Sequence, residues 1–112
     1  MNPSDLYSLI LSTLTNARAQ MLTPAYQGSA ELADPGVRLK ASQTLIDVQQ
    51  AILSLSNASL SDIASAMQAN STALTAAISD LNAALKQVTQ VLSILDDATT
   101  LLKIVAKIVP FV

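Results

Sequence analysis

Apolar residues along this chain recur every three or four positions, which is the period of an amphipathic helix. The first such face predicts a helix over residues 4–22, with Asn2 or Ser4 as its N-cap. Pro24 is expected to end this helix, because proline lacks the backbone N–H that a helix interior needs. Residues 23–35 are therefore predicted to form a loop.

A second helix is predicted over residues 36–56. Asp34 is a good N-cap and Pro35 suits the first helical position. Its apolar stripe consists of Ala41, Leu45, Val48, Ile52 and Leu55, with Leu39, Ile46 and Leu53 beside it. The polar stretch 56–59 breaks the pattern, and Leu60 is expected to begin the next helix.

The rest of the chain predicts one long helix over residues 60–109, because no glycine or proline occurs in that range. Every seventh residue is apolar, which is typical of coiled-coil packing. This row is Met67, Leu74, Leu81, Val88, Leu95, Leu102 and Val109. A helix of this length would extend roughly 73 Å. A break near Asn70 would give a bundle of four helices in place of three.

The long helix is predicted to exceed what the rest of the chain can cover. Residues 36–56 form a helix of roughly 32 Å, less than half its length. The long helix also has a second apolar row, which lies four residues after the first row in its N-terminal part and three residues after it in its C-terminal part. This change of spacing rotates the apolar face by roughly 100°. Part of 91–112 is thus expected to lack a partner within the chain. The candidate interaction residues are Leu95, Leu102, Val105, Ile108, Val109 and Phe111. A buried bundle helix and a membrane-inserted helix are alternatives for this stretch.

Composition supports an all-α fold in a single helical domain covering residues 1–112. The apolar fraction is 51% but aromatic residues make up only 3%, so the core must be aliphatic, which suits helix-on-helix packing. Charged residues make up 12% and the net charge is −2. A weakly charged surface repels copies of itself little, which favours homo-oligomers. It has no basic face for nucleic acid.

Groups able to carry chemistry are scarce. The chain has no cysteine and no histidine, which excludes disulfides, the usual zinc sites and imidazole acid–base catalysis. The neighbouring carboxylates of Asp96 and Asp97 would point about 100° apart on a helix, so they cannot act as a pair. Two glycines are too few for a phosphate-binding loop. We therefore expect no enzyme, no catalytic or metal-binding residue and no cofactor.

The leading functional hypothesis is a structural or interaction protein that assembles with itself, or with another helical protein, through its long C-terminal helix. A membrane-active protein, such as a small pore-former, toxin component or envelope-associated factor, is the second. A carrier of an apolar ligand such as a fatty acyl chain is the third. The N-terminus lacks the pattern of a secretory signal and no run is long enough to span a membrane. A cytoplasmic location or signal-independent secretion is therefore expected.

Overall fold

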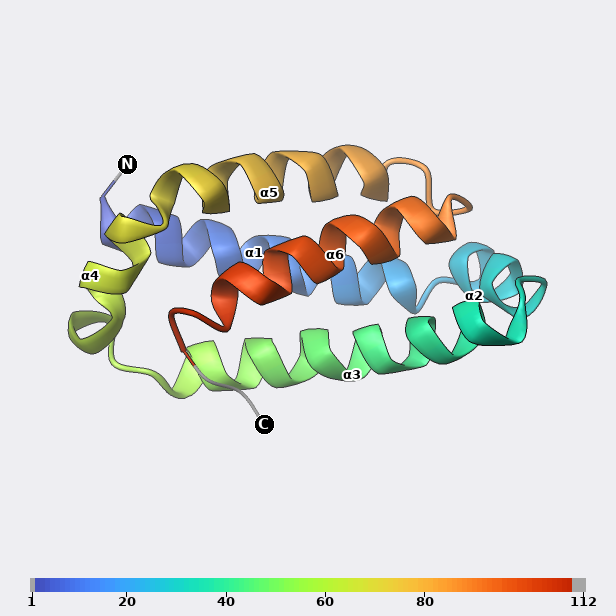
Figure 1. Cartoon of the computed structure of the whole chain (residues 1–112), viewed down its shortest axis with the longest axis horizontal. Coiled ribbons are helices and arrows are strands. Elements are labelled where there is room, and N and C mark those ends of the chain that lie inside the picture. The colour runs from blue at the N-terminus through green and yellow to red at the C-terminus, as the bar shows by residue number, and fades with distance from the viewer. Residues whose placement is uncertain (1, 110–112) are drawn as a thin grey trace.

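Helices account for all the regular structure that the computed structural model shows in residues 2–109, which are the residues it describes (Figure 1). The predicted all-α class is confirmed, but the number of helices differs from the three or four expected. The helices are α1 (Pro3–Met21), α2 (Pro24–Glu31), α3 (Pro35–Asn57), α4 (Leu60–Ala69), α5 (Ser71–Leu85) and α6 (Val91–Val105). None of them is long and apolar enough to cross a bilayer.

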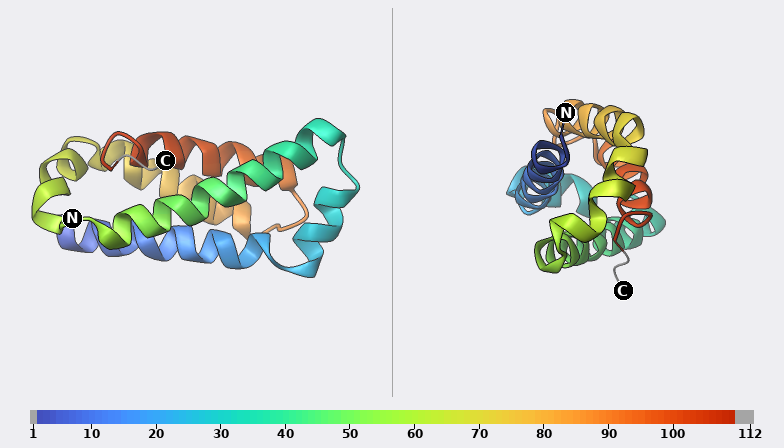
Figure 2. Two further views of the ribbon diagram at one scale, coloured as in Figure 1. Left: turned by 90° about the horizontal axis from the view of Figure 1, so that it is seen from below. Right: turned by 90° about the vertical axis from the view of Figure 1, so that its left-hand side faces the viewer.

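Four of these helices, α1, α3, α5 and α6, lie side by side as a bundle, in a molecule that measures 43 × 26 × 18 Å. Both α1 and α6 pack against α3 and α5, so α1 lies diagonally opposite α6 and α3 lies opposite α5 (Figure 2). The chain reaches α5 from α3 through the short α4, which crosses one end of the bundle and packs against α1. The outer side of α3 consequently faces away from the other three bundle helices, while α2 lies beside its N-terminal half.

The first and third helices begin and end close to the predicted positions. Asn2 caps α1, where its side-chain oxygen accepts a hydrogen bond of 2.8 Å from the backbone N–H of Asp5. Asp34 occupies the N-cap position of α3 and Pro35 its first turn, as predicted, although the Asp34 side chain makes no capping hydrogen bond. The local signals for helix starts were therefore sufficient in these two places.

The loop predicted over residues 23–35 was wrong, because α2 occupies its first part. Thr23 is the N-cap, and its hydroxyl oxygen accepts a hydrogen bond of 3.3 Å from the backbone N–H of Tyr26. Pro24 therefore begins this helix as well as ending the previous one, since proline fits the first helical turn. The threonine–proline pair carried the signal that the sequence interpretation missed.

The single long helix predicted over residues 60–109 was also wrong. It is interrupted at Asn70, the break considered as an alternative, where the side-chain amide donates to the carbonyl of Ala66 at 2.8 Å. A second interruption, at residues 86–90, lets α6 fold back and pack against α5. A continuous helix would have left half of its apolar face in water, whereas the turn removes that surface at the cost of a few helical hydrogen bonds.

Most of the row of apolar residues at every seventh position is buried despite these breaks, and Val88 and Val109 are partly buried. Met67, Leu74, Leu81 and Leu95 are completely buried and Leu102 is 7% exposed. They lie on three different helices that all face one aliphatic core. The heptad spacing thus indicated burial correctly, but it did not indicate one continuous helix.

Candidate functional site

The residues predicted to form an interaction surface lie in the core of the chain itself. Leu95 and Val105 are fully buried in α6, and Leu102 and Ile108 are at most 8% exposed. Val109 is partly buried against the same core, while Phe111 lies outside the described residues. Most of the predicted surplus of apolar surface in residues 91–109 is therefore covered by α3 and α5, and Leu92 is the exception at 56% exposed. A second copy cannot reach these side chains while α6 stays in the bundle.

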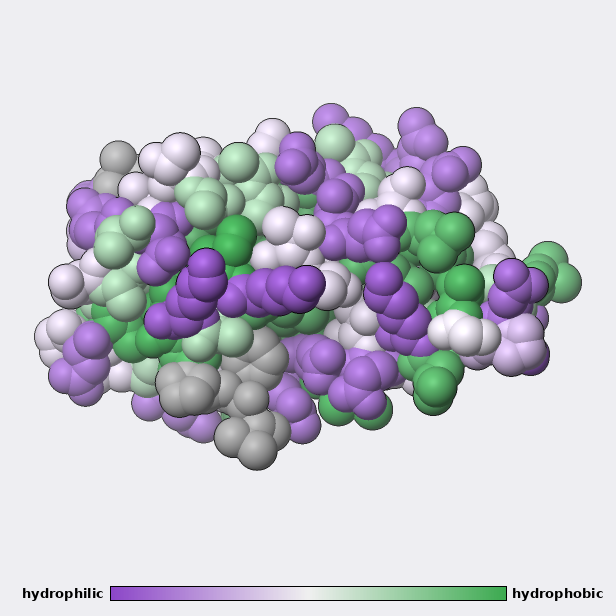
Figure 3. Space-filling model, viewed as in Figure 1, coloured by the Kyte–Doolittle hydropathy of each residue, from purple (hydrophilic) through white to green (hydrophobic). Residues whose placement is uncertain are grey.

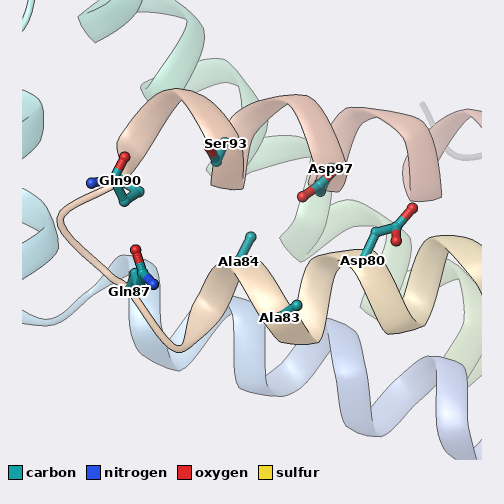
Figure 4. Close-up of a pocket in the computed structure, with 7 residues that line it drawn as sticks. All are labelled: Asp80, Ala83, Ala84, Gln87, Gln90, Ser93 and Asp97. Carbon is teal, nitrogen blue, oxygen red and sulfur yellow. The ribbon is translucent and has the colours of Figure 1, made fainter.

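A hollow of about 400 Å³ lies between α5 and α6. Figure 4 shows Asp80 on α5 and Asp97 on α6, facing the space between the two helices, with Ser93 one turn before Asp97. Burial raises the pKa of Asp97, and the negative charges of Asp80 and Asp96 raise it further. Within residues 2–109 no three acidic, histidine or cysteine side chains come together as a metal site would require. The carboxylates of Asp80 and Asp97 therefore repel each other across this hollow.

A groove of about 380 Å³ between α2 and α3 is lined by Tyr26, Ala30 and Leu45, with Glu31 and Arg38 also on its wall. Tyr26 is 2% exposed, and its hydroxyl has no hydrogen-bond partner within residues 2–109. Burial raises the pKa of this hydroxyl. The oxygen has almost no accessible surface, so a ligand in the groove cannot reach it without a rearrangement.

A row of large apolar side chains lies on the solvent side of α3. Leu39, Ile46 and Leu53 are 73%, 46% and 62% exposed. Seven residues are two helical turns less about 20°, so the three side chains form a nearly straight line along the helix. We call these three residues the outer row. It extends over about 21 Å of helix, and Val48 lies on the opposite side, facing the core.

The inner side of α3 is built from smaller residues than the outer row. Apart from Leu55 its buried residues are Ala41, Thr44, Val48 and Ala51. Hydrophobicity alone would place leucine and isoleucine inside before alanine and threonine. The most buried positions of the helix are thus mostly small, which allows a close approach. Leu45 and Ile52 pack partly buried against the core, and the outer row lies in water.

Uncharged polar residues border the outer row on both sides. Ser42 and Gln49 lie along one side, and Gln43 and Gln50 lie along the other, as the helical period requires. Hydroxyl and amide side chains lose little on desolvation if they find hydrogen-bond partners, unlike charged ones. The border is therefore compatible with a second helix lying on the row.

A second exposed apolar cluster lies at one end of the molecule. Leu32 is 91% exposed and Leu92 is 56% exposed, and with the partly buried Val37 they line a shallow hollow of about 380 Å³. We call these three residues the end group. Figure 3 shows apolar side chains over the α2–α3 junction and the start of α6, and again along the edge formed by α3.

Sequence reasoning missed the outer row, although a signal was present. Leu39, Ile46 and Leu53 were interpreted as broadening the core stripe, but they are about 180° from its centre at Val48 on a helical wheel. Their spacing of seven residues separates them from the core row Ala41, Val48 and Leu55, which has the same spacing two residues later. Two parallel rows on one helix indicate two contact faces.

Comparison with known proteins adds no relative to this picture. No protein family, curated protein sequence or solved structure matches the chain. The exposed side chains of α3, together with the low charge and the composition of the chain, are therefore the features that indicate a function.

Proposed function

We propose that this chain is a non-enzymatic interaction protein that associates with itself through the outer row of α3. The observation that carries the proposal is the exposure of Leu39, Ile46 and Leu53 in one line, on the side of α3 opposite the core. Scattered exposed leucines need no explanation, but large apolar side chains aligned on one face of a long helix are typical of a helix-pairing surface. Ile46 also lines the groove against α2 and is the least exposed of the three.

The energetic balance supports a weak and concentration-dependent complex. Full burial of a leucine or isoleucine contributes about 1.5–3 kcal/mol, and the row is 46–73% exposed. The rows of two copies together then contribute roughly 5–11 kcal/mol. Loss of translational and rotational freedom costs about 4–15 kcal/mol. We therefore expect a dissociation constant on the order of micromolar or weaker.

The size of the surface supports the same strength. A helix of 23 residues is about 34 Å long and about 10 Å wide, so its outer face offers roughly 350 Å² per copy. A standard stable interface buries about 800 Å² on each partner. The pairing of α3 alone is therefore expected to be reversible, and it is favoured by the low net charge of −2.

The proposal is tested by measuring the average mass across a concentration series. The natural chain should rise from 11.7 kDa toward twice that value. A double variant, Leu39→Gln with Leu53→Gln, should stay at the monomer mass, since glutamine keeps helix propensity but removes the apolar contact. A matched control, Leu22→Gln with Leu92→Gln, removes two leucines that are 54% and 56% exposed elsewhere.

The control variant should associate like the natural chain. A natural chain that remains monomeric at the highest attainable concentration would contradict the proposal. So would a Leu39 and Leu53 double variant that associates as strongly as the natural chain. Far-ultraviolet circular dichroism checks that both variants keep their helices.

A second candidate function, binding at a membrane surface, is favoured by the end group. Leu32 and Leu92 protrude together at one end of the molecule, where they can enter the interface of a bilayer without any helix crossing it. Flotation with neutral phosphatidylcholine vesicles tests this function. A double variant of the end group, Leu32→Gln with Leu92→Gln, should then lose binding while the Leu39 and Leu53 double variant keeps it.

A further inference from the structure

The outer row is symmetric about its middle residue. Leu39 and Leu53 lie seven residues on either side of Ile46, about 10.5 Å away along the helix. A two-fold axis passing beside Ile46 therefore brings Leu39 of one copy opposite Leu53 of the other, and brings Ile46 against its own copy. Such an isologous contact uses one surface patch twice, as the commonest protein dimers do.

Charge decides between the two directions in which a second α3 can lie. Arg38 and Lys40 both lie in the first two turns of α3, with one acidic residue, Asp34, at its N-cap and another, Asp47, near its middle, and the last turn has no charged residue. Parallel pairing would bring the basic residues of the two copies together. Antiparallel pairing brings them to the C-terminal end of the partner helix, where the free carbonyl groups carry partial negative charge.

Arg38 is the residue that gains most from the antiparallel arrangement. Lys40 is already engaged within the chain, where its ammonium group lies 3.2 Å from the carboxylate of Asp96. Arg38 makes no ion pair in the part of the chain that the structure describes, and it lies near the positive end of its own helix dipole. In an antiparallel dimer its guanidinium lies within reach of the last turn of the partner's α3.

We propose that two copies of this chain pair through antiparallel α3 helices about a two-fold axis at Ile46. This inference rests on the proposed self-association and adds the orientation, the register and the role of Arg38. The occupant of the outer row is then a second copy of the same helix, with the two basic N-terminal halves held apart.

Single cysteines test the orientation, because the natural chain has none. Under mild oxidation Ile46→Cys should form a disulfide-linked dimer with itself. Leu39→Cys alone and Leu53→Cys alone should not, since like positions are about 21 Å apart along the helix in the antiparallel register. An equimolar mixture of Leu39→Cys and Leu53→Cys should give the cross-linked dimer. Leu22→Cys, exposed at the end of α1, is the matched control and should stay monomeric.

Each outcome decides a different point. Self-linking of Leu39→Cys and of Leu53→Cys, with no gain on mixing, would overturn the antiparallel arrangement in favour of a parallel one. The self-association would survive that result, because the mass measurement on the natural chain reports it separately. Absence of linkage from all outer-row cysteines, together with a monomeric natural chain, would overturn both proposals. Absence of linkage with a dimeric natural chain would overturn the antiparallel register, and the mass of the Leu39→Gln and Leu53→Gln double variant would then decide whether the outer row is the contact at all.

The role of Arg38 can be measured separately, without any cysteine. Arg38→Gln should raise the dissociation constant of the dimer several-fold, and it should reduce the dependence of that constant on salt. A parallel dimer predicts the reverse sign, because removing Arg38 would relieve repulsion between like charges. Tighter association of Arg38→Gln would therefore overturn the antiparallel arrangement.

Discussion

The two helices α3 and α6 use their apolar residues in opposite ways. In α6 the large residues face the core, and Leu92 in the first turn is its only large apolar side chain that is mostly in water within the described part of the helix. In α3 most of the buried positions carry small residues, with Leu45 and Ile52 partly buried beside them, and the bulky Leu39, Ile46 and Leu53 face solvent. Both helices belong to the same bundle and each packs against two of its other three helices, so membership of the bundle alone does not account for the difference.

The contrast separates residues needed for folding from residues that the fold does not use. The core-facing side of α6 is packed against α3 and α5, where the loss of even one methylene group affects stability. The outer row of α3 contributes little to the folded chain by itself. Large apolar residues kept in such a place are therefore better explained by a contact outside the chain than by stability.

The largest expected effect compares one leucine from each helix. Leu101→Ala removes a fully buried side chain of α6 and should lower the free energy of unfolding by about 2–5 kcal/mol. Leu53→Ala removes a side chain that is 62% exposed and should change it by no more than about 0.5 kcal/mol. Urea unfolding of dilute, monomeric protein, followed by circular dichroism, measures both. Equal losses would mean that the outer row supports the fold itself and would remove the contrast.

A smaller effect concerns the two tyrosines that pack around α3. The hydroxyl of Tyr7 on α1 donates a hydrogen bond of 2.6 Å to the carbonyl of Leu55, whereas the buried hydroxyl of Tyr26 has no partner within residues 2–109. Tyr7→Phe should lower the free energy of unfolding by about 0.5–1.5 kcal/mol, since the Leu55 carbonyl still accepts from the backbone N–H of Ala58.

Tyr26→Phe should have the opposite sign. It removes a buried polar group that gains nothing in the folded state, so the free energy of unfolding should rise by roughly 1 kcal/mol. The same urea experiment measures both variants against the natural chain. A loss of stability in Tyr26→Phe would show that its hydroxyl is bonded in solution, for example to an ordered water.

The sequence was sufficient where a single residue has a local mechanism. The capping by Asn2 and the alternative break at Asn70 each rest on a side chain that bonds to a nearby backbone group. The restart at Leu60 was also predicted correctly, although Ser59 at its N-cap makes no side-chain capping hydrogen bond. The burial of Leu95 and Leu102 also agrees with the heptad row, as a property of a face rather than of one continuous helix.

The features that could not be predicted depend on contacts between distant segments. Residues 86–90 contain no glycine or proline, and they form a turn because packing α6 on α5 buries more surface than a straight helix would. Likewise, nothing local to α3 says whether Leu39 or Ala41 faces the core. That choice follows from the close approach of its neighbours α1 and α6, and it decides where the outer row lies.

The smallest expected effect concerns the polar side of α6. Burial raises the pKa of Asp97, and Asp80 and Asp96 raise it further, so the folded chain binds a proton at Asp97 more readily than the unfolded chain does. The free energy of unfolding should therefore decrease as the pH rises from the ordinary aspartate pKa through the raised value, and stay lower above it. Asp97→Asn should remove this decrease. At neutral pH it should stabilise the chain by a few tenths of a kcal/mol, the scale of charge pairs in contact with water.

Asp80→Asn tests the cause of this shift, because it removes a neighbouring charge but leaves Asp97 where it is. Burial is the larger cause, so Asp80→Asn should stabilise the chain less than Asp97→Asn at neutral pH. The advantage of Asp97→Asn should disappear below the ordinary aspartate pKa, where both states of the natural chain are protonated. Thermal unfolding between acid and neutral pH measures both variants. If Asp80→Asn gave the larger gain, repulsion across the α5–α6 hollow would dominate, and the polar side of α6 would be strained by its neighbour rather than by its burial.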